Sequence, residues 1–308
     1  MTHERADQDA VSVTSASRNA NGEGRPSLSK PAVIREDQGM FDLVLAGFDG
    51  SPDSRRAVAW AAAEAVGRRA RLEIVSCYEV PWVGKAPVTV ERVREIESGT
   101  DTELDAFVAE VAAAHPGLAV TGDTVAGRPR HVLRDAGERA DLVVVGAGHD
   151  GSERFLRSGA TARFVGRHSA APVAIIPTTS GEHCVERVVV GVDGDGTDGP
   201  ALGWAADDAQ RRSVDLVVVH ADPACASSAR SVVERAVEAA RAGRDLTVHY
   251  TIAPSDPAPA LLEAAGSTAL IVVGRRHSTA AASFALGTCT RSLLRHTEVP
   301  VVVVDIRR

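Results

Sequence analysis

Two stretches of the chain decide its fold, because they repeat one another: LVLAGFDGSPDSRRAVAWAA at residues 43–62 and RVVVGVDGDGTDGPALGWAA at residues 187–206. Gly47, Asp49 and Trp60 all recur 144 positions further along the chain. Self-similarity of this kind is typical of a duplicated structural unit. A chain of 308 residues is also long enough for about two domains of ordinary size. We therefore expect two tandem copies of one domain.

The later parts of the two copies repeat at a shorter shift of 128 residues, because ADLVVVG at 140–146 is matched by TALIVVG at 268–274. The second copy has therefore lost about 16 residues, which map near Pro81 to Glu97 of the first copy. We predict one domain at residues 41–180 and the other at residues 185–308. Residues 1–40 are polar and poor in apolar side chains, so we expect a disordered tail there.

Within each copy, short runs of Val, Ile and Leu alternate with Ala-, Arg- and Glu-rich stretches of helical period. This alternation is typical of a parallel sheet that is buried on both faces. We predict an α/β fold in which each domain is a doubly wound, five-stranded parallel sheet. The predicted strands are 43–48, 71–77, 118–125, 141–146, 172–176, 187–192, 214–220, 245–252, 269–273 and 299–305.

The fifth strand of each copy is apolar, and in an isolated domain it would be an exposed edge. Exposed apolar edges favour strand pairing. We therefore expect the strands at 172–176 and 299–305 to bring the two domains together edge to edge as an internal pseudo-dimer.

Composition excludes several classes of function. The net charge of −7 disfavours nucleic acid as a partner, because phosphate binding depends on clustered Lys and Arg. No stretch approaches the ~20 apolar residues of a membrane span, so we expect no membrane partner. The widely spaced cysteines fit a reducing compartment and lack zinc-ligand spacing, so we expect a cytoplasmic protein without a metal site of its own. These cysteines are Cys77, Cys184, Cys225 and Cys289.

Two loops per copy suit ligand binding, because doubly wound sheets bind ligands at the carboxyl ends of their strands. One follows the first strand, where Asp49-Gly50-Ser51 also provides a helix N-cap in Ser51. The other follows the fourth strand, where Gly159 comes thirteen residues after Gly146. In the second copy, Gly287 follows Gly274 at the same spacing. A glycine lets backbone N–H groups approach a phosphate, and a helix N-terminus adds a favourable partial charge.

The Asp49-Gly50-Ser51 opening, the glycine frame after the fourth strand and the closing Pro-Val strand resemble the universal stress protein family, whose fold is of the adenine nucleotide α-hydrolase-like type. The resemblance covers residues 41–308. ATP-binding members of that family carry Gly-x2-Gly-x9-Gly-Ser/Thr. Here His149 and His277 replace the second glycine, Ala160 replaces the terminal hydroxyl in the first copy, and Thr288 keeps it in the second.

The resemblance implies a non-catalytic stress-response protein that binds ATP or another adenine nucleotide, with Mg²⁺. It places the carboxylates of Asp49 and Asp193 at the ribose and the backbone of Cys77 and Ala221 beside the adenine. It places the remaining predicted site residues around the ribose and phosphates: Gly50, Ser51, Gly146, His149, Gly159, Ala160, Gly274, His277, Gly287 and Thr288. A protein partner and a homodimer beyond the internal pseudo-dimer are further expectations. A nucleotide-free interaction scaffold and a weak nucleotide hydrolase are the alternatives.

Three other sequence patterns suggest different functions or environments. GAGHDG at 146–151 matches the GxGxxG dinucleotide fingerprint, but it follows the fourth strand and lacks the acidic partner, which disfavours NAD. GSPDS at 50–54 resembles the SGGxDS loop of ATP pyrophosphatases, but the second copy breaks it. Basic clusters around Arg68 and Arg275 are interpreted as solvated surface, and Trp60 is expected in the core.

Overall fold

The computed structural model describes residues 42–80, 82–83, 86–87, 89–148, 159–179, 185–194, 199–223, 228–275 and 287–306. These residues all belong to the unit that spans Met40–Arg308. The predicted disordered tail, His149, His277, Cys184 and Cys225 lie outside the described residues.

The first half of the chain alternates strands with helices, as the sequence pattern predicts. Its elements are β1 (Leu43–Phe48), α1 (Pro52–Arg68), β2 (Arg71–Tyr78), β3 (Trp82–Val83), β4 (Ala86–Pro87), α2 (Val90–Ala114), β5 (Val120–Ala126), α3 (Pro129–Ala136), β6 (Leu142–Gly146), α4 (Ala160–His168) and β7 (Val173–Ile176).

The second half repeats this order with a shorter connection after its second strand. Its elements are β8 (Arg187–Val192), α5 (Gly199–Arg212), β9 (Asp215–Ala221), α6 (Ala229–Arg241), β10 (Val248–Ala253), α7 (Pro257–Ala265), β11 (Ala269–Arg275), α8 (Thr288–His296) and β12 (Val301–Asp305). The missing residues of this copy correspond to the antiparallel β3–β4 hairpin and to the extra length of α2. That hairpin has no counterpart among the predicted strands.

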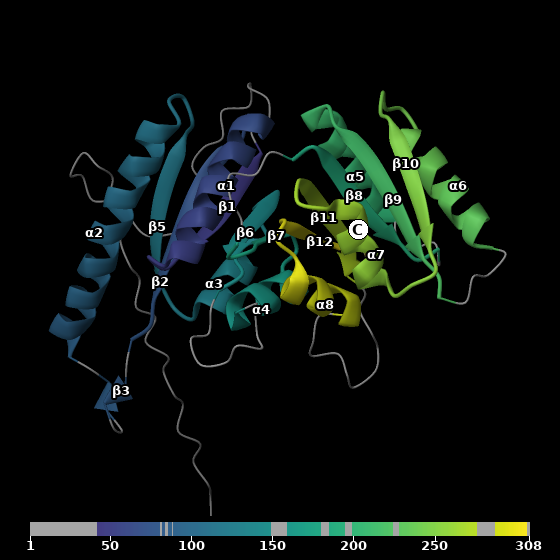
Figure 1. The fold of residues 1–308 in the computed structure, drawn as a ribbon. Coiled ribbons are helices and arrows are strands. Elements are labelled where there is room, and N and C mark those ends of the chain that lie inside the picture. The colour runs from purple at the N-terminus through teal and green to yellow at the C-terminus, as the bar shows by residue number, and fades with distance from the viewer. Residues whose placement is uncertain are drawn as a thin grey trace, which may run out of the picture. The chain divides into compact units, whose positions relative to one another are not determined.

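Ten of the strands in the described ranges form one sheet, in the order β10-β9-β8-β11-β12-β7-β6-β1-β2-β5. Neighbouring strands are parallel except for β7 and β12, which pair antiparallel with Val302 opposite Ala174. These two strands meet where the two halves join (Figure 1). The predicted strands are confirmed to within a few residues, and so is the edge-to-edge pairing of the fifth strands. The exact domain limits stay a prediction.

Helices cover both faces of the sheet, and a continuous apolar core lies under each face. One core joins α1, α2, α5 and α6 to one set of strand side chains, and the other joins α3, α4, α7 and α8 to the alternate set. Each core crosses the β7–β12 junction, because alternate residues of both strands belong to different cores. Trp60 lies in the first core, as expected, and is 8% exposed.

The two halves are also held together by charged side chains between α1 and α5. Glu64 accepts from Arg68 Nε at 2.6 Å, and Asp208 accepts from Arg68 Nη2 at 2.9 Å and from Arg212 Nε at 2.7 Å. Arg211 pairs with both carboxylates. The interpretation of Arg68 as solvated surface is therefore wrong, since its side chain is only 13% exposed. The reason is that the duplication brings the ends of α1 and α5 face to face, which one copy alone does not reveal.

Candidate functional site

A cavity of about 350 Å³ lies at the carboxyl ends of β1, β2 and β6. It sits where the strand order reverses, because β1 has β2 on one side and β6 on the other. This volume lies within the ~300–1,000 Å³ range of small-molecule pockets. Six of the predicted site residues line it: Asp49, Ser51, Cys77, Gly146, Gly159 and Ala160. Gly50 forms the adjoining turn with a φ of 77°.

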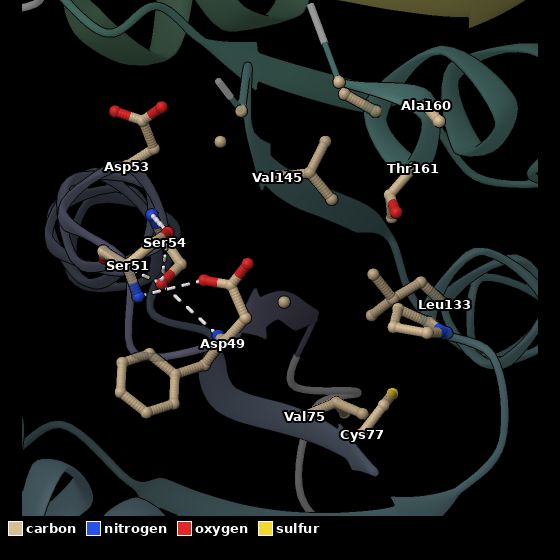
Figure 2. Close-up of a pocket in the computed structure, with 17 residues that line it drawn as sticks. Asp49, Ser51, Asp53, Ser54, Val75, Cys77, Leu133, Val145, Ala160 and Thr161 are labelled. Carbon is tan, nitrogen blue, oxygen red and sulfur yellow. Dashed lines mark hydrogen bonds between the residues drawn. The ribbon is translucent and has the colours of Figure 1, made fainter. Parts of the chain in front are cut away.

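The carboxylate of Asp49 stands at the end of β1 and is oriented by the turn that follows it. The backbone N–H of Ser51 donates to Asp49 Oδ1 at 3.0 Å, and the N–H of Asp49 donates to Ser54 Oγ at 3.3 Å (Figure 2). Burial raises the pKa of Asp49, but hydrogen bonds from Ser51 and Ser54 outweigh burial and leave the pKa below its ordinary value. At neutral pH this carboxylate is therefore ionised and accepts hydrogen bonds only.

The two helices that begin at this cavity have different N-termini. In α1, Ser51 is the N-cap that the sequence predicts, and its Oγ accepts from Ser54 N at 3.2 Å. In α4 the N-cap is Gly159, which has no side chain, and no side chain of the described residues bonds to the first turn. The first amides of a helix need an acceptor from outside the helix. The start of α4 therefore offers backbone N–H groups at the cavity.

Two glycines allow the backbone segments around this cavity to approach closely. A Cβ on Gly146 would lie 2.8 Å from the carbonyl oxygen of Asp53, so only glycine lets the end of β6 pack against the first turn of α1. Gly148 has a φ of 69°, in the left-handed region that favours glycine. A Cβ there would lie 3.4 Å from the Cα of Gly159.

Sequence reasoning missed several lining residues. Asp53 is buried, pairs with Arg56 and accepts from Thr178 Oγ1 at 3.3 Å. Thr161 stands one residue after Ala160, and Figure 2 shows its hydroxyl directed toward the side of the cavity where Leu133 lies. The hydroxyl that Ala160 lacks is thus present one position later. A motif with fixed spacing places the hydroxyl at Ala160, so it does not reveal the hydroxyl of Thr161.

Apolar side chains form the wall opposite the α1 turn, and they include Val75, Leu133 and Val145. Cys77 lies beside them at the end of β2. Burial, together with the charges of Asp123 and Glu79, raises the pKa of the Cys77 thiol to about 12. The thiol is therefore neutral at physiological pH. Among the described lining residues there is no Lys or Arg, and the charge of Asp53 is offset by Arg56, which leaves the carboxylate of Asp49 as the unbalanced charge of the lining.

The second half has a corresponding cavity of about 330 Å³ at the ends of β8, β9 and β11. All five described site residues predicted for this copy line it: Asp193, Ala221, Gly274, Gly287 and Thr288. Arg275 also lines it, and this side chain is only 5% exposed. The interpretation of Arg275 as solvated surface is therefore wrong, because its guanidinium is hydrogen-bonded across the junction between the halves.

The described residues contain no group of three or more His, Cys, Asp and Glu side chains that could hold a metal ion. No helix among them is both long and apolar enough to cross a membrane.

Comparisons with known proteins match most of the chain. The profile of the Universal stress protein family matches residues 40–177 and again 185–305. Universal stress protein Rv1996 of Mycobacterium tuberculosis is 29% identical over 302 residues, covering 85% of this chain and 95% of that protein. A universal stress protein of Mycolicibacterium smegmatis is 28% identical, with 86% and 97% covered. The crystal structure of a universal stress protein from Archaeoglobus fulgidus superposes with a TM-score of 0.68 at 20% identity, over 86% of this chain and 96% of that one. With its duplicated sheet and two successive matches to the profile, the chain belongs to the universal stress protein family as a tandem member.

Proposed function

We propose that this chain is a non-catalytic, cytoplasmic regulatory protein of the stress response that binds ATP or a related adenine nucleotide in the cavity of the first half. One observation carries the proposal. The ionised carboxylate of Asp49 and the N-terminus of α4, which no described side chain caps, line the same cavity. A ribose needs such an acceptor, and a phosphate needs such donors.

The ribose end of the site is pre-organised. Asp49 is held by the N–H of Ser51, so its carboxylate needs no rearrangement to accept from the hydroxyls of a ribose. Pre-organisation favours binding, because less conformational freedom is lost when the ligand enters. The apolar side chains of Val75 and Leu133 offer a surface for the adenine. The neutral thiol of Cys77 adds no charge there.

At the phosphate end, the first amides of α4 combine hydrogen-bond donors with the positive end of the helix dipole. Gly159 leaves room for close approach, and Thr161 adds a hydroxyl. The carboxylate of Asp49 disfavours a bare polyphosphate in a cavity whose described lining holds no Lys or Arg. We therefore propose that Mg²⁺ arrives with the nucleotide as its counter-ion.

The non-catalytic part of the proposal rests on the protonation states of the lining side chains. A carboxylate whose pKa is lowered, such as Asp49, is a weak general base. A thiol with a pKa of about 12, such as Cys77, is a weak nucleophile. Regulation would then act through a protein partner or a homodimer that distinguishes the loaded chain from the empty one.

Thermal melting with added ATP and Mg²⁺ tests the proposal. A ligand that binds only the folded state stabilises it by about 2.7 kcal/mol when its concentration is one hundred times Kd. We expect Gly159→Trp to abolish the shift that belongs to the first cavity. Gly287→Trp is the matched control, because it fills the other cavity from a position where a Cβ meets no atom within 4 Å.

Each alternative predicts a different result, the scaffold in thermal melting and the hydrolase in phosphate release. If ATP, ADP, AMP and cyclic AMP all leave the melting temperature unchanged, with and without magnesium, the nucleotide proposal fails and the scaffold alternative is favoured. Phosphate release that is lost in Asp49→Ala would instead indicate a weak hydrolase.

A further inference from the structure

The guanidinium of Arg275 reaches from the second half of the chain into the first. Arg275 is the last residue of β11, and its Nη1 donates to the carbonyl of Gly166 at 3.0 Å. Its Nη2 donates to the carbonyl of Ser169 at 2.9 Å and to Asp305 Oδ2 at 2.6 Å. A buried guanidinium with this set of acceptors is fixed in position.

Both carbonyl acceptors lie at the C-terminal end of α4. The last carbonyls of a helix have no partner within the helix, and a cation near them is stabilising. His168 contributes at the same end, because its Nδ1 donates to the carbonyl of Phe164 at 2.9 Å. Arg275, a residue of the second half, therefore caps the C-terminal end of α4 in the first half. This contact fixes the position of α4 relative to β11.

The other end of α4 lines the cavity of the first half, where Gly159, Ala160 and Thr161 stand. The helix has nine residues, so it spans about 13 Å from end to end at 1.5 Å per residue. A short helix held at its C-terminal end presents its N-terminal amides at a fixed place. The geometry of the phosphate end of the first cavity thus depends on a side chain of the second half.

The first half has no arginine at the position equivalent to Arg275. At the 128-residue shift, Arg275 corresponds to Ala147 and Asp305 to Pro177, neither of which carries a charge. At the end of α8 two hydrogen bonds are local, because His296 Nδ1 donates to the carbonyl of Ser292 at 2.9 Å and the N–H of Thr297 donates to the carbonyl of Leu293 at 2.8 Å. The two copies have therefore diverged so that the second half supports the first.

We propose that Arg275 is a positioning residue for the phosphate-binding end of the first cavity. This inference rests on the proposed function. Arg275 holds α4 so that the amides of Ala160 and Thr161 face the phosphates, while the ribose contact of Asp49 does not depend on it. Loss of the guanidinium weakens the binding of phosphate-bearing ligands and leaves the nucleoside part of the affinity in place.

Calorimetric titration of the full chain with ATP and, separately, with adenosine tests this proposal. All variants carry Gly287→Trp, so that only the first cavity is open. The principal variant is Arg275→Met with Asp305→Asn, which removes the guanidinium together with the charge of the carboxylate that it contacts. Arg275→Lys keeps the positive charge but loses the guanidinium that donates to the carbonyls of both Gly166 and Ser169. Arg244→Met is the control, because Arg244 is also ion-paired in the second half, with Asp207 at 2.7 Å.

We expect the principal variant to bind ATP roughly fivefold to tenfold more weakly, in the range of typical couplings between sites. Its affinity for adenosine should stay within about twofold of the parent's. The affinity of Arg275→Lys for ATP should lie between those of the parent and the principal variant, and that of Arg244→Met should equal the parent's. Equal losses for ATP and adenosine, or unchanged ATP binding, would overturn the positioning role. If the parent binds neither ligand, the proposed function itself fails.

Hydrogen exchange of the nucleotide-free chain tests the positioning role independently of the ligand. The amides of residues 163–168, which are bonded within α4, should exchange faster in the principal variant than in the parent, whereas those of α6, which packs in the other core, should not change. Unchanged protection of α4 would contradict the proposal even if ATP binding were weaker.

Discussion

The charged cluster between α1 and α5 gives a prediction that can be worked from the structure. Asp208 is 2% exposed, and its carboxylate meets Arg68, Arg211 and Arg212. Together with Glu64, the cluster contains three guanidinium groups and two carboxylates. Asp208→Asn leaves three guanidinium groups around one carboxylate. Removing one partner from a buried ionic group costs about 3–5 kcal/mol, because the remaining charges stay buried without compensation.

Urea denaturation at pH 7 measures this loss, and the neighbouring residue supplies a control. Asp207 also lies on α5 and pairs with Arg244, but its side chain is 68% exposed. A surface pair of this kind contributes only about 0–1 kcal/mol. The reasoning is refuted if Asp208→Asn and Asp207→Asn lower the free energy of unfolding by amounts within about 0.5 kcal/mol of each other.

The same variant has a predictable pH dependence. Burial raises the pKa of Asp208, but the charges of Arg212, Arg211 and Arg68 outweigh burial and hold the pKa below the ordinary value of 3.8. A depressed pKa stabilises the folded state at pH values above the unfolded pKa, and this stabilisation is lost as the pH falls through the folded pKa. The difference between the parent and Asp208→Asn should therefore be largest near neutral pH and shrink below about pH 4.

Three further predictions concern packing, the cysteines and the junction. Gly146→Ala should cost about 1–3 kcal/mol in urea denaturation, because its Cβ would lie 2.8 Å from a backbone oxygen of α1. Gly203→Ala, whose Cβ meets nothing within 4 Å on α5, should stabilise by about 1 kcal/mol, and a loss there would contradict the account. Burial raises the thiol pKa of Cys77 to about 12 and that of Cys289 to about 11, so both thiols should be alkylated slowly at pH 8 in the folded chain. Peptide-resolved mass spectrometry measures the alkylation rate of each cysteine, and rapid labelling would count against this expectation. Val302→Pro should disrupt the β7–β12 pairing and raise aggregation, whereas an unchanged melting temperature and a monodisperse elution profile would show that the pairing is dispensable.

Much of the fold could be predicted from the sequence, because strands that are buried on both faces are continuous apolar runs. The pairing of β7 with β12 could also be predicted, since an apolar fifth strand needs a neighbour. The β3–β4 hairpin could not, because two-residue strands leave no periodic signal. Some strand ends differ from the predicted ones by a few residues: in the predicted strand 245–252, the pairing begins only at Val248.

The candidate sites could be predicted where the residue type is dictated by backbone geometry. Gly146 and Gly159 are examples, since each sits where another backbone segment comes close. The roles of Arg68 and Arg275 were missed because they depend on contacts between the two halves. A run of arginines in the sequence is the same whether it faces water or a buried carboxylate. Only the placement of the duplicated units decides between these environments.

Native mass spectrometry of the full chain, after incubation with ATP and Mg²⁺, tests whether the first cavity binds a nucleotide. We expect a complex heavier by one bound adenine nucleotide at the first cavity, with that binding lost in Gly159→Trp and kept in Gly287→Trp. A chain that carries no nucleotide at saturating ATP, or binding that persists unchanged in Gly159→Trp, would contradict it.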